Sequence, residues 1–244
     1  MRHAILADIH ANIEAFVAVL DDIAEKGDIE EIWCLGDVVG YGPDPHRCIE
    51  ILRQSNHVCI AGNHDMAAIG RVETTYFNAM AANAIQWTSG QLTPNDVRYL
   101  ENLPETIQKG DFTLVHGSPM EPLWEYVIST GIAIRNFTYF KTNYCLVGHS
   151  HVPAAFMKDR ETGCKNVQLT PGIGLALGDS KMIINPGGVG QPRDGDPRAS
   201  YAIYDDEIQM IHLYRVPYDI ETTQKKIMES GLPVMLASRL EQGR

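Results

Sequence analysis

The residues of this chain with the clearest chemical potential lie in five short segments. They are two carboxylates, one amide and five imidazoles: Asp8, His10, Asp37, Asn63, His64, His116, His149 and His151. Oxygen and imidazole donors bind divalent cations, and several imidazoles together favour a transition metal over Mg²⁺ or Ca²⁺. No cysteine belongs to the set, which argues against a structural zinc site. The set is large enough for two adjacent metals and one free histidine for proton transfer.

Elements upstream of these residues must position them. Apolar residues repeat at helical spacing after Asn12, a candidate N-cap, and the repeat stops at Gly27. A second helix is predicted to begin at Asp44-Pro45, because proline is favoured at the first helical position. Short buried strands are predicted at residues 4–7, 31–35 and 57–61. Strands that alternate with helices imply a parallel sheet with right-handed crossovers.

The middle of the chain contains a predicted helical insert at about residues 75–103, broken at Thr93-Pro94. The insert lies between two of the segments that carry candidate metal ligands. It could therefore cap the site and select the substrate, or it could only pack against the fold. Two strands and one helix are predicted beyond it, at residues 112–115, 144–147 and 132–140 respectively.

The second half of the chain has short strands divided by turn residues, a pattern typical of an antiparallel sheet. The strands are predicted at residues 154–158, 166–169, 181–185, 200–204 and 208–215. Two helices follow, one capped by Asp219 and one beginning at Pro233. Since no linker separates the halves, we expect one α/β domain over residues 1–244, with two sheets packed on each other and helices outside.

Side chains that directly follow the strands should gather at one sheet edge, because ligands of open α/β sheets bind at the carboxyl ends of strands. Asp37 lies 29 positions after Asp8, and Asn63 lies 26 positions after Asp37, each about one strand–helix repeat. One such residue alone could be a helix cap or a turn residue. A metal-competent residue after each strand instead predicts one site, with Asp37 as the carboxylate that bridges two cations.

Composition limits the class of protein. The formal net charge of −11 makes an extensive nucleic-acid interface unexpected. The five cysteines are odd in number and form no C-x-x-C, as expected for reduced thiols in the cytoplasm. The N-terminus enters a strand directly, so no signal peptide is expected, and no apolar run approaches the roughly 20 residues that cross a bilayer.

In chain order the segments read D-x-H, G-D, G-N-H-D, a lone histidine and G-H-x-H, from Asp8 to His151. As a set they resemble the calcineurin-like metallophosphoesterase superfamily. The segment at residues 185–194 also resembles its bacterial phosphodiesterase-like branch. The resemblance implies the metallo-dependent phosphatase fold, a four-layer α/β/β/α sandwich of two mixed sheets flanked by helices.

The resemblance also implies a role for each residue of the set. One metal would be held by Asp8, His10, Asp37 and His151, and the other by Asp37, Asn63, His116 and His149. The two divalent ions would be Mn²⁺ first, with Fe, Zn²⁺ and Ni²⁺ as alternatives. A hydroxide between the metals would attack phosphorus in line, and His64 would protonate the leaving oxygen or stabilise its charge. Asp65 could orient His64, or it could only cap a helix.

One departure from the superfamily is informative. Protein Ser/Thr phosphatases of this superfamily carry Asp-Arg-Gly where this chain has Gly40-Tyr41-Gly42, so we do not expect a protein phosphatase. Arg193 is a candidate replacement for the missing phosphate-binding arginine, or else a solvated turn residue. It follows a glycine-rich loop whose N–H groups could also face an anion. Tyr41 could contact a base or a phosphate, or only close its turn.

These observations favour a metal-dependent phosphodiesterase that acts on a small or nucleotide-like substrate. The same residues would also serve a phosphomonoesterase or a dinucleoside-polyphosphate hydrolase. A scaffold protein with a vestigial metal site is the non-enzyme alternative, but the set lacks no member. The oligomeric state is left open.

Overall fold

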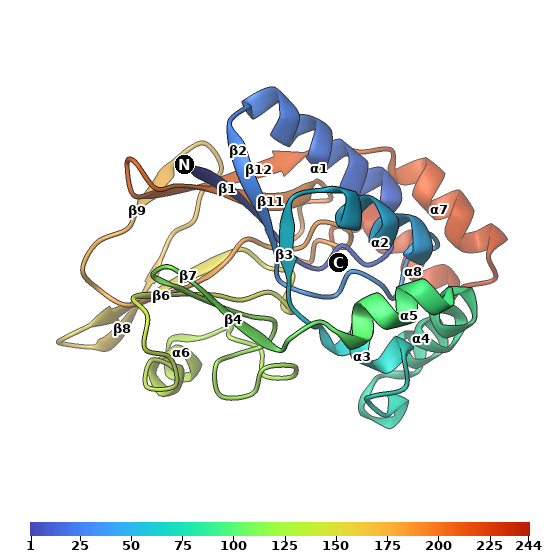
Figure 1. Ribbon diagram of the computed structural model, residues 1–244, viewed down its shortest axis with the longest axis horizontal. Coiled ribbons are helices and arrows are strands. Elements are labelled where there is room, and N and C mark those ends of the chain that lie inside the picture. The colour runs from blue at the N-terminus through green and yellow to red at the C-terminus, as the bar shows by residue number, and fades with distance from the viewer.

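In the computed structural model, which describes residues 1–244, two six-stranded sheets pack face to face (Figure 1). The first sheet has the spatial order β3 (His57–Cys59), β2 (Ile29–Cys34), β1 (Arg2–Leu6), β11 (Ala199–Asp205), β12 (Met210–Val216) and β9 (Gly174–Ala176). The second has the order β4 (Thr106–Lys109), β5 (Phe112–Val115), β6 (Tyr144–Leu146), β10 (Met182–Asn185), β7 (Ala154–Asp159) and β8 (Gly163–Val167). Both sheets mix parallel and antiparallel pairs, which confirms the predicted α/β class with two mixed sheets.

The strands of the second half pair antiparallel with one another, as predicted, but they do not form one sheet. β11 pairs with β1, and β12 and β9 follow it, so these strands complete the first sheet. β10 instead pairs in parallel with β6 and joins the second sheet. Local apolar patterning indicates which residues are buried, but it does not indicate which sheet edge a strand joins. Strands β4 and β9 were not predicted from the sequence.

Helices lie on the outer faces of the sheets. They are α1 (Ile13–Lys26), α2 (Pro45–Gln54), α3 (Asn63–Ala68), α4 (Ala79–Gln91), α5 (Pro94–Glu101), α6 (Thr130–Asn136), α7 (Ile220–Glu229) and α8 (Val234–Ser238), with short 3₁₀ turns η1 (Thr74–Tyr76) and η2 (Leu240–Gln242). Asn12 caps α1 as predicted, since its side chain accepts the Ala15 N–H at 3.1 Å. Residues 75–103 are helical as predicted and form η1, α4 and α5, and Thr93 caps α5 at the predicted break.

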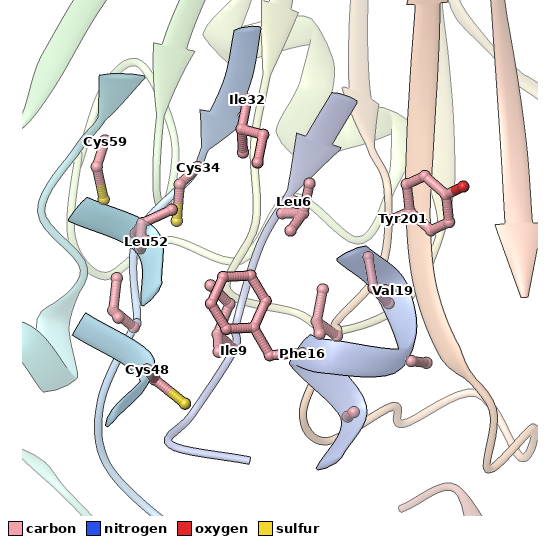
Figure 2. Packing of buried hydrophobic residues seen from close by; sticks show 14 of the residues in the cluster. Leu6, Ile9, Phe16, Val19, Ile32, Cys34, Cys48, Leu52, Cys59 and Tyr201 are labelled. Carbon is pink, nitrogen blue, oxygen red and sulfur yellow. The ribbon is translucent and has the colours of Figure 1, made fainter. Parts of the chain in front are cut away.

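Strand β1 shows how the layers are held. Leu6 faces the helices and packs with Ile9 and Phe16, all buried (Figure 2). Ile5 alternates to the other face and packs against strands of the second sheet. On the far side, a third apolar cluster joins the second sheet to α6, and its members include Phe137. The order of layers is therefore helix, sheet, sheet, helix, with one apolar core in each gap.

The C-terminal helices α7 and α8 pack on α4 and close one side of the fold. None of the helices has both the length and the apolar character that a membrane crossing requires.

Candidate metal centre

All eight residues of the set meet at one edge of the two sheets and are buried. They follow the carboxyl ends of β1, β2, β3, β5 and β6, and all but Asn63 fall into three overlapping groups whose ligand atoms lie within 4.8 Å of one another. The groups are Asp8 with His10 and His151, His10 with Asp37 and His64, and Asp37 with His116 and His149. The structure thus brings together residues that are distant in sequence.

Left-handed backbone turns aim these side chains inward. The φ angles of Asp8, His10, Asp37, His149 and His151 are 56°, 49°, 53°, 64° and 59°. Residues other than glycine rarely adopt this region, and each instance costs on the order of 1–3 kcal/mol. Hydrogen bonds between the turns hold them, as where the His10 N–H donates to the Asp37 carbonyl at 2.9 Å. Five such turns concentrate backbone strain at the site.

Four imidazoles are each fixed by a hydrogen bond to a backbone carbonyl. His10 Nδ1 bonds Val39 O at 3.1 Å, His116 Nδ1 bonds Leu35 O at 2.8 Å, His151 Nδ1 bonds Gln191 O at 2.6 Å, and His149 Nε2 bonds Trp124 O at 3.2 Å. A carbonyl only accepts, so each of these ring nitrogens carries the proton. In the neutral rings of His10, His149 and His151 the opposite nitrogen is therefore a free electron-pair donor, as in histidines that ligate metals. His116 offers such a donor when a metal displaces its second proton.

The free nitrogens face one another. His10 Nε2 lies 3.1 Å from His151 Nε2, and His116 Nε2 lies 3.2 Å from His149 Nδ1. His116 Nε2 is also 3.1 Å from Asn63 Oδ1. Electron pairs that point at each other at this distance repel unless a proton or a metal cation lies between them. The donor set therefore fits two divalent metals.

Asp37 lies between the two pairs of imidazoles. Its Oδ2 is 3.6 Å from His10 Nε2 and 3.3 Å from His116 Nε2. Burial acts to raise the pKa of Asp37, but His116 and His64 outweigh burial and hold this pKa below its usual value. Burial lowers the pKa of His116, but Asp37 and Asp8 raise it to about 9. A carboxylate in this position can contact a cation at either pair.

Asp65 supports the Asp37 turn rather than orienting His64. Its carboxylate accepts the N–H groups of Asp37 at 2.8 Å, Val39 at 3.1 Å and Gly62 at 3.0 Å. The bond to Gly62 caps α3, as the helix-cap interpretation expects. The three bonds fix the turn from which Asp37 points inward.

His64 differs from the four fixed imidazoles. Its Nδ1 is buried with no hydrogen-bond partner, and its ring packs against Tyr41 and Phe77 at centroid distances of 4.4 and 5.0 Å. Burial lowers its pKa to about 4. His64 also lines a cavity of about 160 Å³ that opens onto Asp37, Asn63, His149 and His151. No backbone carbonyl fixes the His64 ring in a metal-binding orientation.

Arg193 and Tyr41 line the same cavity. The Arg193 guanidinium lies 5.7 Å from the centre of the Tyr41 ring, and its Nη2 donates to Gln191 Oε1 at 2.9 Å. Its Nε is buried without a partner. Arg193 is the one Lys or Arg side chain that lines this cavity.

The suggested anion-binding loop of glycines is wrong for Gly187 and Gly190. The Gly187 N–H donates to Asn185 Oδ1 at 2.8 Å, and the Gly190 N–H donates to Asp8 O at 2.9 Å. A Cβ on Gly190 would lie 1.9 Å from Ile9 O. Gly190 therefore allows close backbone packing on the turn after β1, and neither of the two N–H groups is free for an anion.

Four aromatic residues at the cavity were not predicted from the sequence: Tyr76, Phe77, Trp124 and Tyr126. Two belong to the helical insert and two to the loop after His116. That loop carries no further member of the eight-residue set, and only its density of aromatic residues could have indicated a role in the site.

Two packed mixed sheets with a buried His/Asp/Asn centre at their common edge define a metallophosphoesterase. The chain belongs to the calcineurin-like phosphoesterase superfamily, whose domain model matches residues 1–208.

Two relatives and a more distant structural neighbour match almost the whole chain. An uncharacterised protein of Methanocaldococcus jannaschii is 40% identical over 246 residues, with 99% of this chain and 98% of that protein covered. A crystal structure of a metallophosphoesterase from Sphaerobacter thermophilus has 44% identity and a TM-score of 0.91, and covers 100% of this chain and 99% of its own. A hypothetical protein from Pyrococcus horikoshii shares the fold, with 22% identity and a TM-score of 0.81. The match covers 100% of this chain and 98% of that protein.

Proposed function

We propose that the protein is a phosphodiesterase that acts on a small or nucleotide-like substrate. The observation that carries this proposal is the contrast among the buried histidines. Four are fixed by backbone carbonyls with their free nitrogens paired around Asp37, and the fifth, His64, faces the cavity without a partner. The fixed group suits metals, and His64 suits proton transfer.

Two divalent cations fit the donor set, and we assign the ligands as the family motif does. One would be held by Asp8, His10, Asp37 and His151, and the other by Asp37, Asn63, His116 and His149. When bound, the cations would neutralise phosphoryl charge and lower the pKa of water to about 7. Mn²⁺ is our first choice, with Fe, Zn²⁺ and Ni²⁺ as alternatives, because imidazole and carboxylate donors are mixed.

His64 would act on the leaving group. Hydrolysis joins a water oxygen to phosphorus and breaks the bond from phosphorus to the ester oxygen, which then needs a proton. With its pKa lowered to about 4 by burial, the His64 ring is neutral at pH 7 and still offers one N–H. A phosphoryl anion beside the ring would raise this pKa and favour proton donation.

We favour a diester because residues 185–194 resemble the phosphodiesterase-like branch, and a phosphodiester carries one negative charge. Arg193, in that segment, is the one Lys or Arg side chain that lines the cavity beside the proposed cations. The buried Arg193 Nε has no protein partner and could bind that single charge. We further propose that residues 1–244 act as one domain, with the insert of η1, α4 and α5 as a cap over the site.

We place the protein in the cytoplasm, because its five cysteines are all free and buried. With a net charge of −11, we expect a small phosphoester as its partner rather than nucleic acid.

A substrate panel with Mn²⁺ tests the proposal. The panel contains bis-p-nitrophenyl phosphate, a cyclic nucleotide, a nucleoside monophosphate and a dinucleoside polyphosphate. We expect the diesters to be hydrolysed fastest. Preference for the monophosphate or the polyphosphate would replace the diesterase assignment. No hydrolysis of any ester would favour a scaffold with a vestigial site.

A further inference from the structure

The cavity over the metal centre is too small for a whole nucleotide. It measures about 160 Å³, whereas sites that enclose an organic ligand usually exceed roughly 300 Å³. The cavity can receive a phosphoryl group beside Asn63 and Arg193, which line it. The organic part of a substrate must therefore extend out of the mouth.

Aromatic side chains surround that mouth. We call Tyr76, Phe77, Trp124 and Tyr126 the aromatic rim. The Trp124 ring lies 5.7 Å from Tyr76 and 5.1 Å from Phe77, so the rim joins two segments that are far apart in sequence. Tyr76 is 73% exposed and Tyr126 is 44% exposed. Large aromatic rings left in solvent at the entrance of a site are available for stacking.

The loop that carries Trp124 and Tyr126 is held in place before any substrate arrives. Glu125 accepts hydrogen bonds from Ser118 Oγ at 2.8 Å and Asn136 Nδ2 at 2.7 Å, which fixes the loop that carries Trp124 and Tyr126. The Tyr126 ring stacks on His149 with a centroid distance of 3.9 Å and an interplanar angle of 15°. Fixed rings lose little conformational freedom when a ligand stacks on them.

We propose that the aromatic rim binds a flat aromatic group of the substrate, a nucleobase or an aryl group, while the phosphoryl group enters the cavity. This assignment rests on the proposed phosphodiesterase function. It makes the substrates esters that carry such a group. Tyr76 and Tyr126 are then specificity residues that contact the ester group, outside the metal centre.

Phosphonates test this idea by binding alone, because their carbon–phosphorus bond is not an ester. Calorimetry on the metal-loaded protein would compare phenylphosphonate with methylphosphonate. We expect phenylphosphonate to bind on the order of tenfold more tightly, the usual contribution of one stacked ring. Tyr76→Leu and Tyr126→Leu should each remove most of this difference. Tyr139→Leu, which replaces a 59% exposed tyrosine outside the cavity, should leave it unchanged.

Nucleobase and aryl groups are separated by a second pair of ligands. Adenosine 5′-monophosphate and ribose 5-phosphate differ only in the base, and both would be tested as inhibitors of bis-p-nitrophenyl phosphate hydrolysis. Tighter inhibition by the nucleotide identifies a base, and a preference confined to phenylphosphonate identifies an aryl group. Equal affinity within both pairs would overturn the role of the rim.

The two proposals fail in different ways. A protein that hydrolyses the diester but shows equal affinities within both ligand pairs retains the proposed function and loses the rim assignment. A protein that hydrolyses no ester loses the proposed function, while the phosphonate titration still reports on the rim. Metal content and thermal unfolding of both tyrosine variants show whether a lost preference for the aromatic ligand reflects a disturbed His149. If Tyr126→Leu does not fold, Tyr76→Leu, in an exposed turn, alone tests the role of the rim.

Discussion

Gly62 lies directly against the Asp37 carboxylate. A Cβ on Gly62 would lie 2.0 Å from Asp37 Oδ1 and 2.3 Å from the Asp37 nitrogen. The absence of a side chain at position 62 is therefore what lets the candidate bridging carboxylate occupy its position.

Gly62→Ala should displace Asp37 and lose metal. We expect bound metal, measured by atomic emission, to fall well below that of the wild type, with hydrolysis falling in parallel. Gly90→Ala is the matched control, since a Cβ there meets nothing within 4 Å in α4. That control should keep its metal and gain about 0.5–1 kcal/mol of stability from helix propensity. Full metal content in Gly62→Ala would show that Asp37 does not hold the cations.

His64→Ala should separate chemistry from metal binding. The histidine lines the cavity but has no carbonyl partner that fixes it as a ligand. We expect turnover to fall about 10²–10⁴-fold, the usual contribution of a general acid, with the metal content intact. His46→Ala, which replaces a histidine with 49% side-chain exposure, is the control and should turn over normally. Loss of metal from His64→Ala would identify His64 as a ligand instead.

Removal of metal should reduce stability as well as activity. The neutral His10 and His151 rings place two free nitrogens 3.1 Å apart, and these repel each other without a cation, so chelation should lower Tm. A metal present at 100 times its Kd stabilises by about 2.7 kcal/mol, which corresponds to roughly 5–10 °C for a chain of this size. Differential scanning calorimetry after dialysis against chelator measures the shift, and added Mn²⁺ should restore both Tm and hydrolysis. An unchanged Tm with full activity would refute the metal assignment.

Asp65→Asn should weaken the turn that holds Asp37. The amide NH₂ would face backbone N–H groups that the carboxylate oxygens now accept, and buried donors left unpaired cost about 1–3 kcal/mol. Urea unfolding should show this loss, together with weaker metal binding. Asp21→Asn, on the exposed side of α1, should change neither quantity. If Asp65→Asn matches the wild type in stability, its three hydrogen bonds are not important for the turn.

The sequence was sufficient for the parts of the fold that depend on local patterns. Asn12, Thr93 and the helical periodicities located their helices, and the placement of Asp8 and Asp37 after strands indicated one shared edge. The sheet membership of β10 and β11 depends on which edge was free, which is a property of the whole fold.

Three features of the site also could not be predicted from the sequence. The left-handed turns at His149 and His151 are unfavourable for their residue types and persist only because the surrounding structure imposes them. The carbonyls that fix the imidazoles, such as Leu35 O and Gln191 O, belong to the backbone, so no residue type in the sequence predicts them. The aromatic rim depends on two segments that meet only in three dimensions.

The loop after His116 performs two tasks at neighbouring positions. The Trp124 carbonyl fixes the His149 ring, and the Tyr126 side chain stacks on that same ring. Tyr76 packs against Trp124 in the rim, whereas its neighbour Phe77 packs against His64. Substitutions at Tyr76 should therefore change which ester is accepted while the reactive centre stays intact, whereas changes at Phe77 or in the loop after His116 would alter selectivity and reactivity together. In this architecture Tyr76 is the position of the rim that is free to diversify.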